Sequence, residues 1–154
     1  MTQVISQGSI PGFTASLAAA GGQLAPTRAA PAFSLIVPCY NERNAIAGTL
    51  DVLRKSLQAL GSYEIIVVDD GSTDGSADFV RSAFPQVKVL ALPENRGFGG
   101  GSNAGFREAR NDIVVLLNSD MRVSPDFLAP LLEGFADPAV FSVSCQIFFS
   151  DPNK

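Results

Sequence analysis

Acidic and amide side chains in this sequence come directly after short apolar runs. Asp69 and Asp70 follow the run EIIVV, while Asn118 and Asp120 follow the run DIVVLL. A carboxylate at the end of a buried strand accepts hydrogen bonds from a nucleobase or ribose, or it binds a hard divalent cation. Each of these roles has a structural alternative, in a turn or at the start of a helix.

Asp120 has three interpretations: a helix cap, a turn residue or a metal ligand. Ser124 stands directly before Pro125, so it is the better N-cap for a helix that begins at the proline. The sequence contains no histidine, so acid–base and metal chemistry falls to carboxylates. Oxygen ligands favour magnesium or manganese over zinc. The pattern favours a metal ligand at Asp120, with a turn residue left open.

The pair Asp69 and Asp70 is costly because adjacent carboxylates repel each other. A turn that leads to Asp74 as the N-cap of the next helix explains residues 71–74. It does not require two acids before the glycine. The pair therefore favours recognition of a nucleobase or ribose, with the turn as its alternative.

The segment NRGFGGGSNAG, residues 95–105, has five glycines in eleven positions. Glycines let a backbone approach a ligand closely. The run, with Asp120 about 20 residues later, is also a weak match to a dinucleotide-binding fingerprint. That fingerprint needs its first glycine directly after a strand, whereas residues 93–96 intervene here. An NAD(P)-binding oxidoreductase domain stays open as an alternative.

A second alternative is a receiver-like signalling module, because VVDDGS is typical of an acidic phospho-acceptor pocket. A receiver also needs a lysine on a later strand. The only lysine after Lys88 is Lys154, at the end of the sequence, which counts against this alternative.

Apolar patterns define the elements that must position these residues. Strands are predicted at residues 33–38, 64–69, 87–92, 112–117 and 140–149, and helices at 44–60, 72–84, 102–110 and from Pro125 onward. Strands that alternate with helices predict an α/β fold, a mostly parallel sheet covered on both faces. Residues 1–31, rich in Ala, Gly, Ser and Pro, are predicted to be a flexible tail, and residues 32–154 a single domain.

Composition limits the classes of function. The chain has 154 residues, 46% hydrophobic and 17% charged, as in a soluble globular domain. A net charge of -4 argues against a nucleic-acid-binding face. Cys39 and Cys145 form no ligand motif and are expected to be buried free thiols of a reducing compartment. No apolar run reaches the roughly 20 residues of a membrane span, and no signal peptide is recognised. The expected location is cytoplasmic, with peripheral attachment to the inner membrane face left open.

Taken together, the segments FSLIVPCYNE, VVDDGSTD, NRGFGGGSNAG and LLNSDMRVSPDFL resemble the N-terminal half of an inverting family 2 glycosyltransferase with the GT-A fold, a Rossmann-like sheet flanked by helices. The resemblance covers residues 33–149. The donor-binding residues that it implies are Pro38, Tyr40, Glu42, Asp69, Asp70, Arg96, Gly97, Asn103, Asn118 and Asp120. It implies that Asp70, with Asp69 nearby, recognises the base or ribose, and that Asp120 binds Mg²⁺ or Mn²⁺.

The sequence departs from the family at two places. The first position of its DxD element is Asn118, as in bacterial rhamnosyltransferase-like enzymes that build surface polysaccharides. The family's catalytic base is expected downstream of Lys154, so the chain looks truncated, without its acceptor part, and inactive alone. Asp126, Glu133 and Asp137 are interpreted as solvated helix residues. The resemblance implies in-line transfer from a UDP-, dTDP- or GDP-sugar to a saccharide or lipid-linked acceptor.

Overall fold

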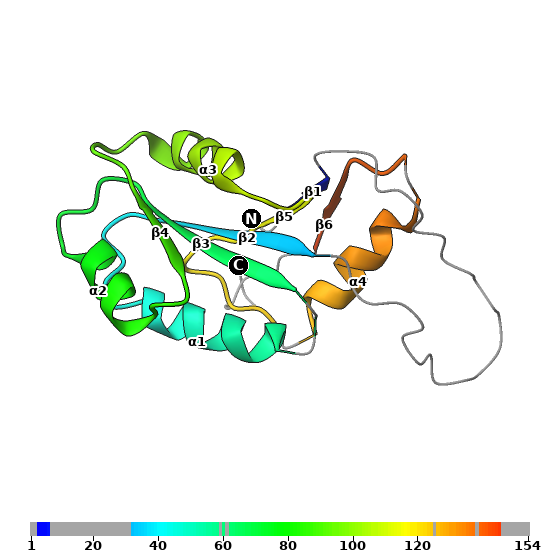
Figure 1. The fold of residues 1–154 in the computed structure, drawn as a ribbon, viewed down its shortest axis with the longest axis horizontal. Coiled ribbons are helices and arrows are strands. Elements are labelled where there is room, and N and C mark those ends of the chain that lie inside the picture. Colours follow the sequence, from blue (N-terminus) through cyan, green and yellow to red (C-terminus); the bar gives the residue numbers. More distant parts are fainter. Residues whose placement is uncertain are drawn as a thin grey trace, which may run out of the picture.

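The computed structural model describes residues 3–6, 32–58, 60, 62–124, 126–137 and 139–145. Within them, strands alternate with helices along most of the chain (Figure 1). The elements are β1 (Gln3–Ser6), β2 (Phe33–Cys39), α1 (Ile46–Leu57), β3 (Tyr63–Asp69), α2 (Ser76–Ala83), β4 (Lys88–Ala91), α3 (Gly97–Glu108), β5 (Ile113–Leu116), α4 (Leu128–Glu133), the 3-10 helix η1 (Gly134–Ala136) and β6 (Ser142–Ser144).

The described strands form one sheet in the order β4-β3-β2-β5-β1-β6. β4, β3, β2 and β5 are parallel, and β1 is antiparallel to β5 and β6. The chain runs outward from β2 to β3 and β4, then returns to β5 on the other side of β2. In sheets of this kind a crevice lies outside the carboxyl ends of the strands, at the point where the order reverses. The boundary between β2 and β5 is therefore the expected place for a ligand.

Helices cover both faces of the parallel part of the sheet, as predicted. α1 and α2 lie on one face and α3 on the other (Figure 1). Successive side chains of a strand point to opposite faces. In β2, Leu35 and Val37 accordingly pack in the larger cluster with Leu50 of α1, while Ile36 packs in a smaller cluster against Phe106 of α3.

The start of α3 differs from the sequence prediction. The helix begins at Gly97, five residues before the predicted start at Ser102, so most of the glycine-rich run is helical. Glycine disfavours helix locally, and tertiary packing overrides that preference here. A Cβ on Gly105 would lie 2.5 Å from Cγ2 of Ile36, so this glycine lets α3 lie close against β2.

Both ends of the chain also differ from the prediction. Gln3–Ser6 form β1, although they belong to the predicted flexible tail. The other residues of that tail, 1–2 and 7–31, lie outside the described residues. The β-branched residues Val4 and Ile5 favour a strand, but four residues are too few to show a period. The last strand is described only at Ser142–Ser144, and residues 146–149 of its prediction lie outside the described residues.

The remaining helices are shorter than predicted, and two predicted N-caps are wrong. Gly75 in a left-handed conformation, not Asp74, is the N-cap of α2, although the Asp74 carboxylate accepts a hydrogen bond from the Ser76 amide. Phe127, not Ser124, precedes the first residue of α4. Pro125 lies outside the described residues.

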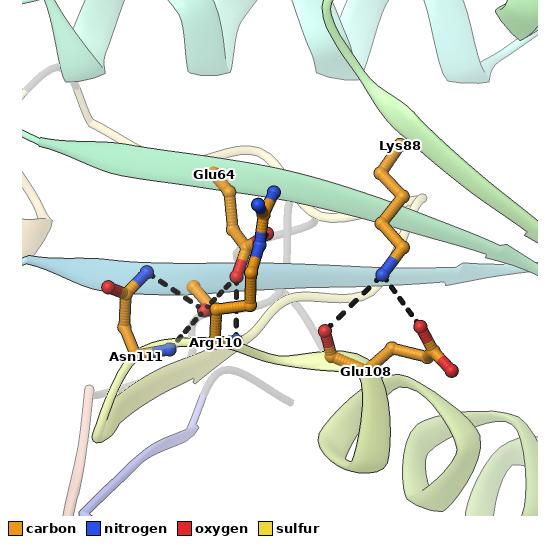
Figure 2. A network of polar contacts seen from close by, with 6 residues as sticks. Glu64, Lys88, Glu108, Arg110 and Asn111 are labelled. Atoms are coloured by element: carbon orange, nitrogen blue, oxygen red, sulfur yellow. Dashed lines mark hydrogen bonds and ion pairs between the residues drawn. The ribbon is translucent and has the colours of Figure 1, made fainter.

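A polar network joins the amino ends of the strands, opposite the edge where a ligand is expected (Figure 2). The Ser34 hydroxyl of β2 donates to Glu64 Oε1 of β3 at 2.7 Å. Arg110 donates to the same carboxylate through its amide at 2.8 Å and its Nε at 3.0 Å. Asn111 donates to Ser34 Oγ, so the network ties β2, β3 and the entry to β5 together.

Replacing Glu64 with glutamine is expected to destabilise the fold in a pH-dependent way. Burial alone raises the pKa of Glu64, but the hydrogen bonds from Ser34 and Arg110 outweigh it and hold this pKa below its ordinary value of 4.5. The ionised side chain therefore stabilises the fold above pH 4.5, and this contribution is lost as the pH falls through the lowered pKa.

We expect Glu64→Gln to lower the free energy of unfolding by about 1 kcal/mol at pH 7, because an acceptor of charge-assisted hydrogen bonds is lost. The difference from the wild type should shrink below pH 4.5. Urea unfolding at several pH values measures it. Glu108→Gln, which weakens an exposed ion pair with Lys88, is the control and should have a smaller effect. A difference for Glu64→Gln that is the same at pH 7 and at pH 3 would contradict this account.

Candidate functional site

A cavity of about 320 Å³ opens at the carboxyl edge of the sheet, at the boundary between β2 and β5. Its walls come from the end of β2, from the residues after β2, β3 and β5, and from the start of α3 with the loop before it. The lining residues are Pro38, Cys39, Tyr40, Glu42, Asp70, Asn95, Gly97, Phe98, Asn118, Ser119 and Asp120. Seven of the ten residues that the resemblance implies for donor binding thus lie together, although they are spread over more than eighty positions of the sequence.

Asp70 is the buried acid of this cavity, and the residue is 5% exposed. Its Oδ1 accepts a hydrogen bond from the Arg96 amide at 2.9 Å. A Cβ on Gly101 of α3 would lie 3.5 Å from Asp70 Cγ, so the helix holds the carboxylate closely. Oδ2 has no hydrogen-bond partner among the described residues. Asp70 therefore keeps an acceptor atom for a ligand in the cavity.

Asp69 has a different role from its neighbour. It is the last residue of β3, it is 3% exposed, and it does not line the cavity. Its Oδ1 accepts a hydrogen bond from the Ser72 amide at 2.7 Å. This bond closes the turn after β3. The structural alternative considered for the acid pair thus describes Asp69, while Asp70 faces the cavity.

Asn118 and Asp120 reach the cavity from the turn after β5. Asn118 Oδ1 is buried and has no hydrogen-bond partner among the described residues. Asp120 is exposed, and the Thr49 hydroxyl of α1 donates to the carbonyl of Ser119 between them. A buried amide oxygen without a partner is costly, so a ligand or ion in the cavity would satisfy Asn118.

The donor atoms at this place fit a magnesium or manganese ion. Asp120 offers a carboxylate and Asn118 a carbonyl oxygen, and both ions prefer oxygen ligands. Within the described part of the chain, no three His, Cys, Asp or Glu side chains gather into a metal site. Two protein oxygens suit an ion that shares its coordination with phosphate oxygens and water rather than one held in an all-protein cage.

A second cavity, of about 470 Å³, lies between α1 and residues 117–123 and shares Ser119 and Asp120 with the first. Asp120 therefore stands between the two cavities. The lining of the second cavity includes the apolar side chains of Val52, Leu53 and Met121.

Two aromatic side chains are half exposed at the first cavity. Tyr40 is 47% exposed and follows β2, while Phe98 is 49% exposed and lies in the first turn of α3. Large apolar side chains at a cavity offer flat surfaces on which an aromatic ring can stack. Tyr40 was predicted, whereas Phe98 was missed, along with Cys39, Asn95 and Ser119. Phe98 is the one aromatic residue of the glycine-rich run, and this feature of the sequence could have identified it as a candidate.

Cys39 lies in the cavity wall as a buried free thiol. Burial first, and then the charge of Asp69, raise the pKa of Cys39 to about 12. The thiol is therefore protonated at neutral pH and is neither a nucleophile nor a ready metal ligand. Cys145 is also a free thiol, but it is half-buried rather than buried as predicted.

Arg96 and Asn103 do not line the cavity, although both were predicted near the donor. Arg96 contributes its amide to Asp70, and its side chain is half exposed. Asn103 is exposed on α3, and its carbonyl accepts a hydrogen bond from Arg107.

The carboxylates near α4 lie away from both cavities. Asp126, Glu133 and Asp137 are exposed, as predicted. Only Glu133 belongs to a helix, because Asp126 precedes α4 and Asp137 follows η1.

Two solved structures to which this chain is similar are glycosyltransferases of the GT-A type. The mannosyltransferase PcManGT from Pyrobaculum calidifontis, in complex with GDP-Man and Mn²⁺, has a TM-score of 0.64 and 33% identity, covering 75% of this chain and 35% of its own. S. aureus TarS 1-349 in complex with UDP-GlcNAc has a TM-score of 0.58 and 30% identity, covering 67% of this chain and 30% of its own. The fold is thus that of a GT-A glycosyltransferase domain.

The chain belongs to glycosyl transferase family 2, whose sequence model matches residues 34–154. An undecaprenyl-phosphate 4-deoxy-4-formamido-L-arabinose transferase from Edwardsiella ictaluri is 35% identical over 108 residues, 65% of this chain and 32% of its own. A dolichol-phosphate mannosyltransferase from Pyrococcus furiosus is 35% identical over 116 residues, 73% of this chain and 32% of its own. The chain thus spans about a third of the length of these relatives.

Family membership confirms the resemblance to family 2 glycosyltransferases and the predicted α/β fold of the GT-A type. It also decides against the NAD(P)-binding and receiver-like alternatives. The placement of the glycines agrees, since they lie inside α3 rather than in a turn directly after β4. None of the helices in the described part of the chain has the length and hydropathy of a membrane span.

Proposed function

We propose that this chain binds the nucleoside-diphosphate sugar donor of an inverting glycosyltransferase, together with a divalent metal ion. The observation that carries the proposal is the cavity in which Asp70 of the β3 end meets Asn118 and Asp120 of the β5 end. Asp70, a buried carboxylate with a free acceptor atom, suits the nucleoside of such a donor. The side-chain oxygens of Asn118 and Asp120 suit a metal ion bound to its diphosphate. PcManGT, solved with GDP-Man and Mn²⁺, supports both parts by similarity.

The nucleoside lies between the ends of β2 and β3 in this proposal. Asp70 Oδ2 accepts a hydrogen bond from the base or the ribose, while the Arg96 amide keeps the carboxylate in place. The half-exposed ring of Tyr40 packs against the nucleoside, and stacking of this kind contributes about 1 kcal/mol. Pro38 and Gly97 complete the walls.

The diphosphate lies over the turn after β5. Asn118 and Asp120 are the residues that would hold Mg²⁺ or Mn²⁺ there. When bound, the ion offsets the negative charge of the leaving nucleoside diphosphate. Asn118 Oδ1, buried and unpartnered among the described residues, gains a partner in this arrangement.

The reaction that we propose is a single in-line displacement. A carboxylate base deprotonates an acceptor hydroxyl, which attacks the anomeric carbon as the diphosphate leaves, so the anomeric configuration inverts. Glu42, Asp70 and Asp120 are the acids at the described cavity, and all three are assigned to the donor. None of these three acids is assigned as the base.

The acceptor that we propose is a saccharide or a lipid-linked molecule. Relatives named for undecaprenyl phosphate and dolichol phosphate support the lipid-linked kind. With a lipid phosphate as acceptor, an already ionised phosphate oxygen takes the place of the deprotonated hydroxyl as the attacking atom. Such an acceptor implies a cytoplasmic protein that works at the inner face of the membrane.

The test is calorimetric titration with UDP, dTDP and GDP, with and without Mn²⁺, and with NAD as a control ligand. We expect one diphosphate to bind in a metal-dependent manner. Asp120→Ala should weaken that binding at least about tenfold, because a charged metal ligand is lost. Asp126→Ala, which removes an exposed carboxylate outside the cavity, should bind like the wild type. Binding of NAD alone, or equal binding by both variants, would contradict the proposal.

A further inference from the structure

Asn41 has an unusual backbone conformation next to the donor cavity. Among the described residues it is the one non-glycine residue with a positive φ, at 55°. This region is uncommon for residues with a side chain, although asparagine tolerates it best. Its neighbours Tyr40 and Glu42 line the cavity, but Asn41 does not. An outlier of this kind persists where other interactions hold it, and it calls for an account in terms of function.

Hydrogen bonds from the next loop hold Asn41 in place. Its amide donates to Ser72 Oγ at 2.9 Å. Its own Oδ1 accepts a hydrogen bond from the Thr73 amide, also at 2.9 Å. Although Asn41 is exposed, its side-chain oxygen accepts a hydrogen bond from the loop that follows β3 rather than from solvent alone.

The residues after Asn41 continue this connection. The Glu42 amide donates to Ser76 Oγ at 3.1 Å, and the Arg43 amide donates to Asp74 Oδ2 at 3.0 Å. The Arg43 guanidinium also lies over the Phe79 ring of α2, 5.1 Å from its centroid. Arg43 Nη1 also donates to the Gly75 carbonyl, at 3.5 Å. We call the five hydrogen bonds between residues 41–43 and 72–76 the loop bridge. It extends the contact between β2 and β3 beyond the end of the sheet.

The loop bridge fixes the spacing between two walls of the cavity. Tyr40 and Glu42 belong to the loop after β2, whereas Asp70 precedes the loop after β3. The last ladder bond between the strands is the one from the Asp70 amide to the Cys39 carbonyl, at 2.9 Å. Beyond it, the described residues hold the two loops together through the loop bridge.

We infer that Asn41 is a positioning residue for donor binding: its left-handed backbone and its Oδ1 bond to Thr73 set Tyr40 and Glu42 at the distance from Asp70 that a nucleoside requires. The inference rests on the proposed function. Asn41 itself touches no donor and acts through the two loops. A site held in the productive geometry before binding loses less free energy on ordering when the ligand arrives.

Two substitutions distinguish the contribution of the Asn41 backbone conformation from that of its side chain. Asn41→Gly keeps the positive φ at no steric cost but removes the acceptor for Thr73. Asn41→Asp keeps that acceptor and still tolerates the left-handed region. We expect Asn41→Gly to weaken binding of the preferred nucleoside diphosphate with Mn²⁺ by about fivefold, the value of one hydrogen bond. Asn41→Asp should stay within about twofold of the wild type.

Glu64→Gln is the matched control, because it weakens the hydrogen bonds that link β3 to β2 and to Arg110 at the opposite edge of the sheet. It should lower stability without changing nucleotide affinity. If Asn41→Gly binds as well as the wild type, or if Glu64→Gln weakens binding equally, Asn41 has no positioning role.

Hydrogen exchange of the Thr73 amide gives a second readout that needs no ligand. We expect this amide to exchange about fivefold faster in Asn41→Gly than in the wild type and Asn41→Asp, because it has lost its acceptor. If the wild type binds no diphosphate, the proposed function fails for this chain. The exchange rate of the Thr73 amide still tests whether Asn41 holds the loop that follows β3. Unchanged exchange in Asn41→Gly would then overturn the inference.

Discussion

Replacing Gly71 with alanine is expected to lower the free energy of unfolding by about 3 kcal/mol, from backbone strain and a steric clash together. Gly71 has a φ of 76°, a conformation that alanine adopts only with strain. A Cβ there would lie 2.6 Å from the carbonyl carbon of Glu94 and 2.7 Å from the nitrogen of Asn95. Both atoms belong to the main chain, so no change of side-chain rotamer can relieve the clash.

The same substitution should remove nucleotide binding. The loop between β4 and α3 must move to admit the methyl group, and this loop carries Asn95 of the cavity wall. Its movement also pulls the Arg96 amide away from Asp70 Oδ1. The acid that we assign to the nucleoside then loses the donor that orients it.

Gly48→Ala is the matched control for Gly71→Ala. Gly48 lies within α1, has no positive φ, and a Cβ there would meet no atom within 4 Å. Alanine is the better helix former, so this variant should be more stable than the wild type by roughly 0.5–1 kcal/mol. Urea unfolding of the two variants measures the contrast. A Gly71→Ala protein within about 0.5 kcal/mol of the wild type would show that the loop yields without cost.

The parallel core and the edge that carries the site could be predicted from the sequence. Strands buried on both faces read as apolar runs, and each predicted strand of the parallel sheet overlaps an observed one. The carboxyl ends of parallel strands meet at one edge, so the acids and amides after them had to lie close together. Asp70 and Asp120, separated by fifty positions, line one cavity for this reason.

Residues whose role depends on tertiary contacts were outside the reach of the sequence pattern. The start of α3 is one example, because a run of glycines opposes helix until packing against Ile36 and Val68 favours it. Asn41 is another. Nothing in the local pattern indicates a left-handed residue there, since its partners Ser72 and Thr73 are about thirty positions away.

The difference between Asp69 and Asp70 was within reach of the sequence, through the alternation of a strand. Ile65 and Val67 pack in the cluster that includes α1, so Asp69 shares their face. Ile66 and Val68 pack beneath α3 on the other face, and Asp70 continues that side. An acid on the face of α3 lies under the start of that helix, where the cavity opens.

This alternation leads to the sharpest test of the site, a comparison of Asp70→Asn with Asp69→Asn. Both variants remove one negative charge, and each amide oxygen can still accept the backbone hydrogen bond that the carboxylate accepts now. Asp70→Asn should weaken binding of the preferred nucleoside diphosphate roughly 10- to 100-fold, because a charge-assisted hydrogen bond to the nucleoside is lost in a buried place.

Asp69→Asn should change the affinity by no more than about twofold, since its side chain closes a turn and does not line the cavity. Calorimetric titration in the presence of Mn²⁺ measures both affinities, and urea unfolding verifies that the variants are folded. Equal losses in the two variants would mean that the acid pair acts through its summed charge on the metal and diphosphate. A loss confined to Asp70→Asn would instead assign recognition of the nucleoside to one oxygen, Oδ2, the atom that the α3 contacts leave free.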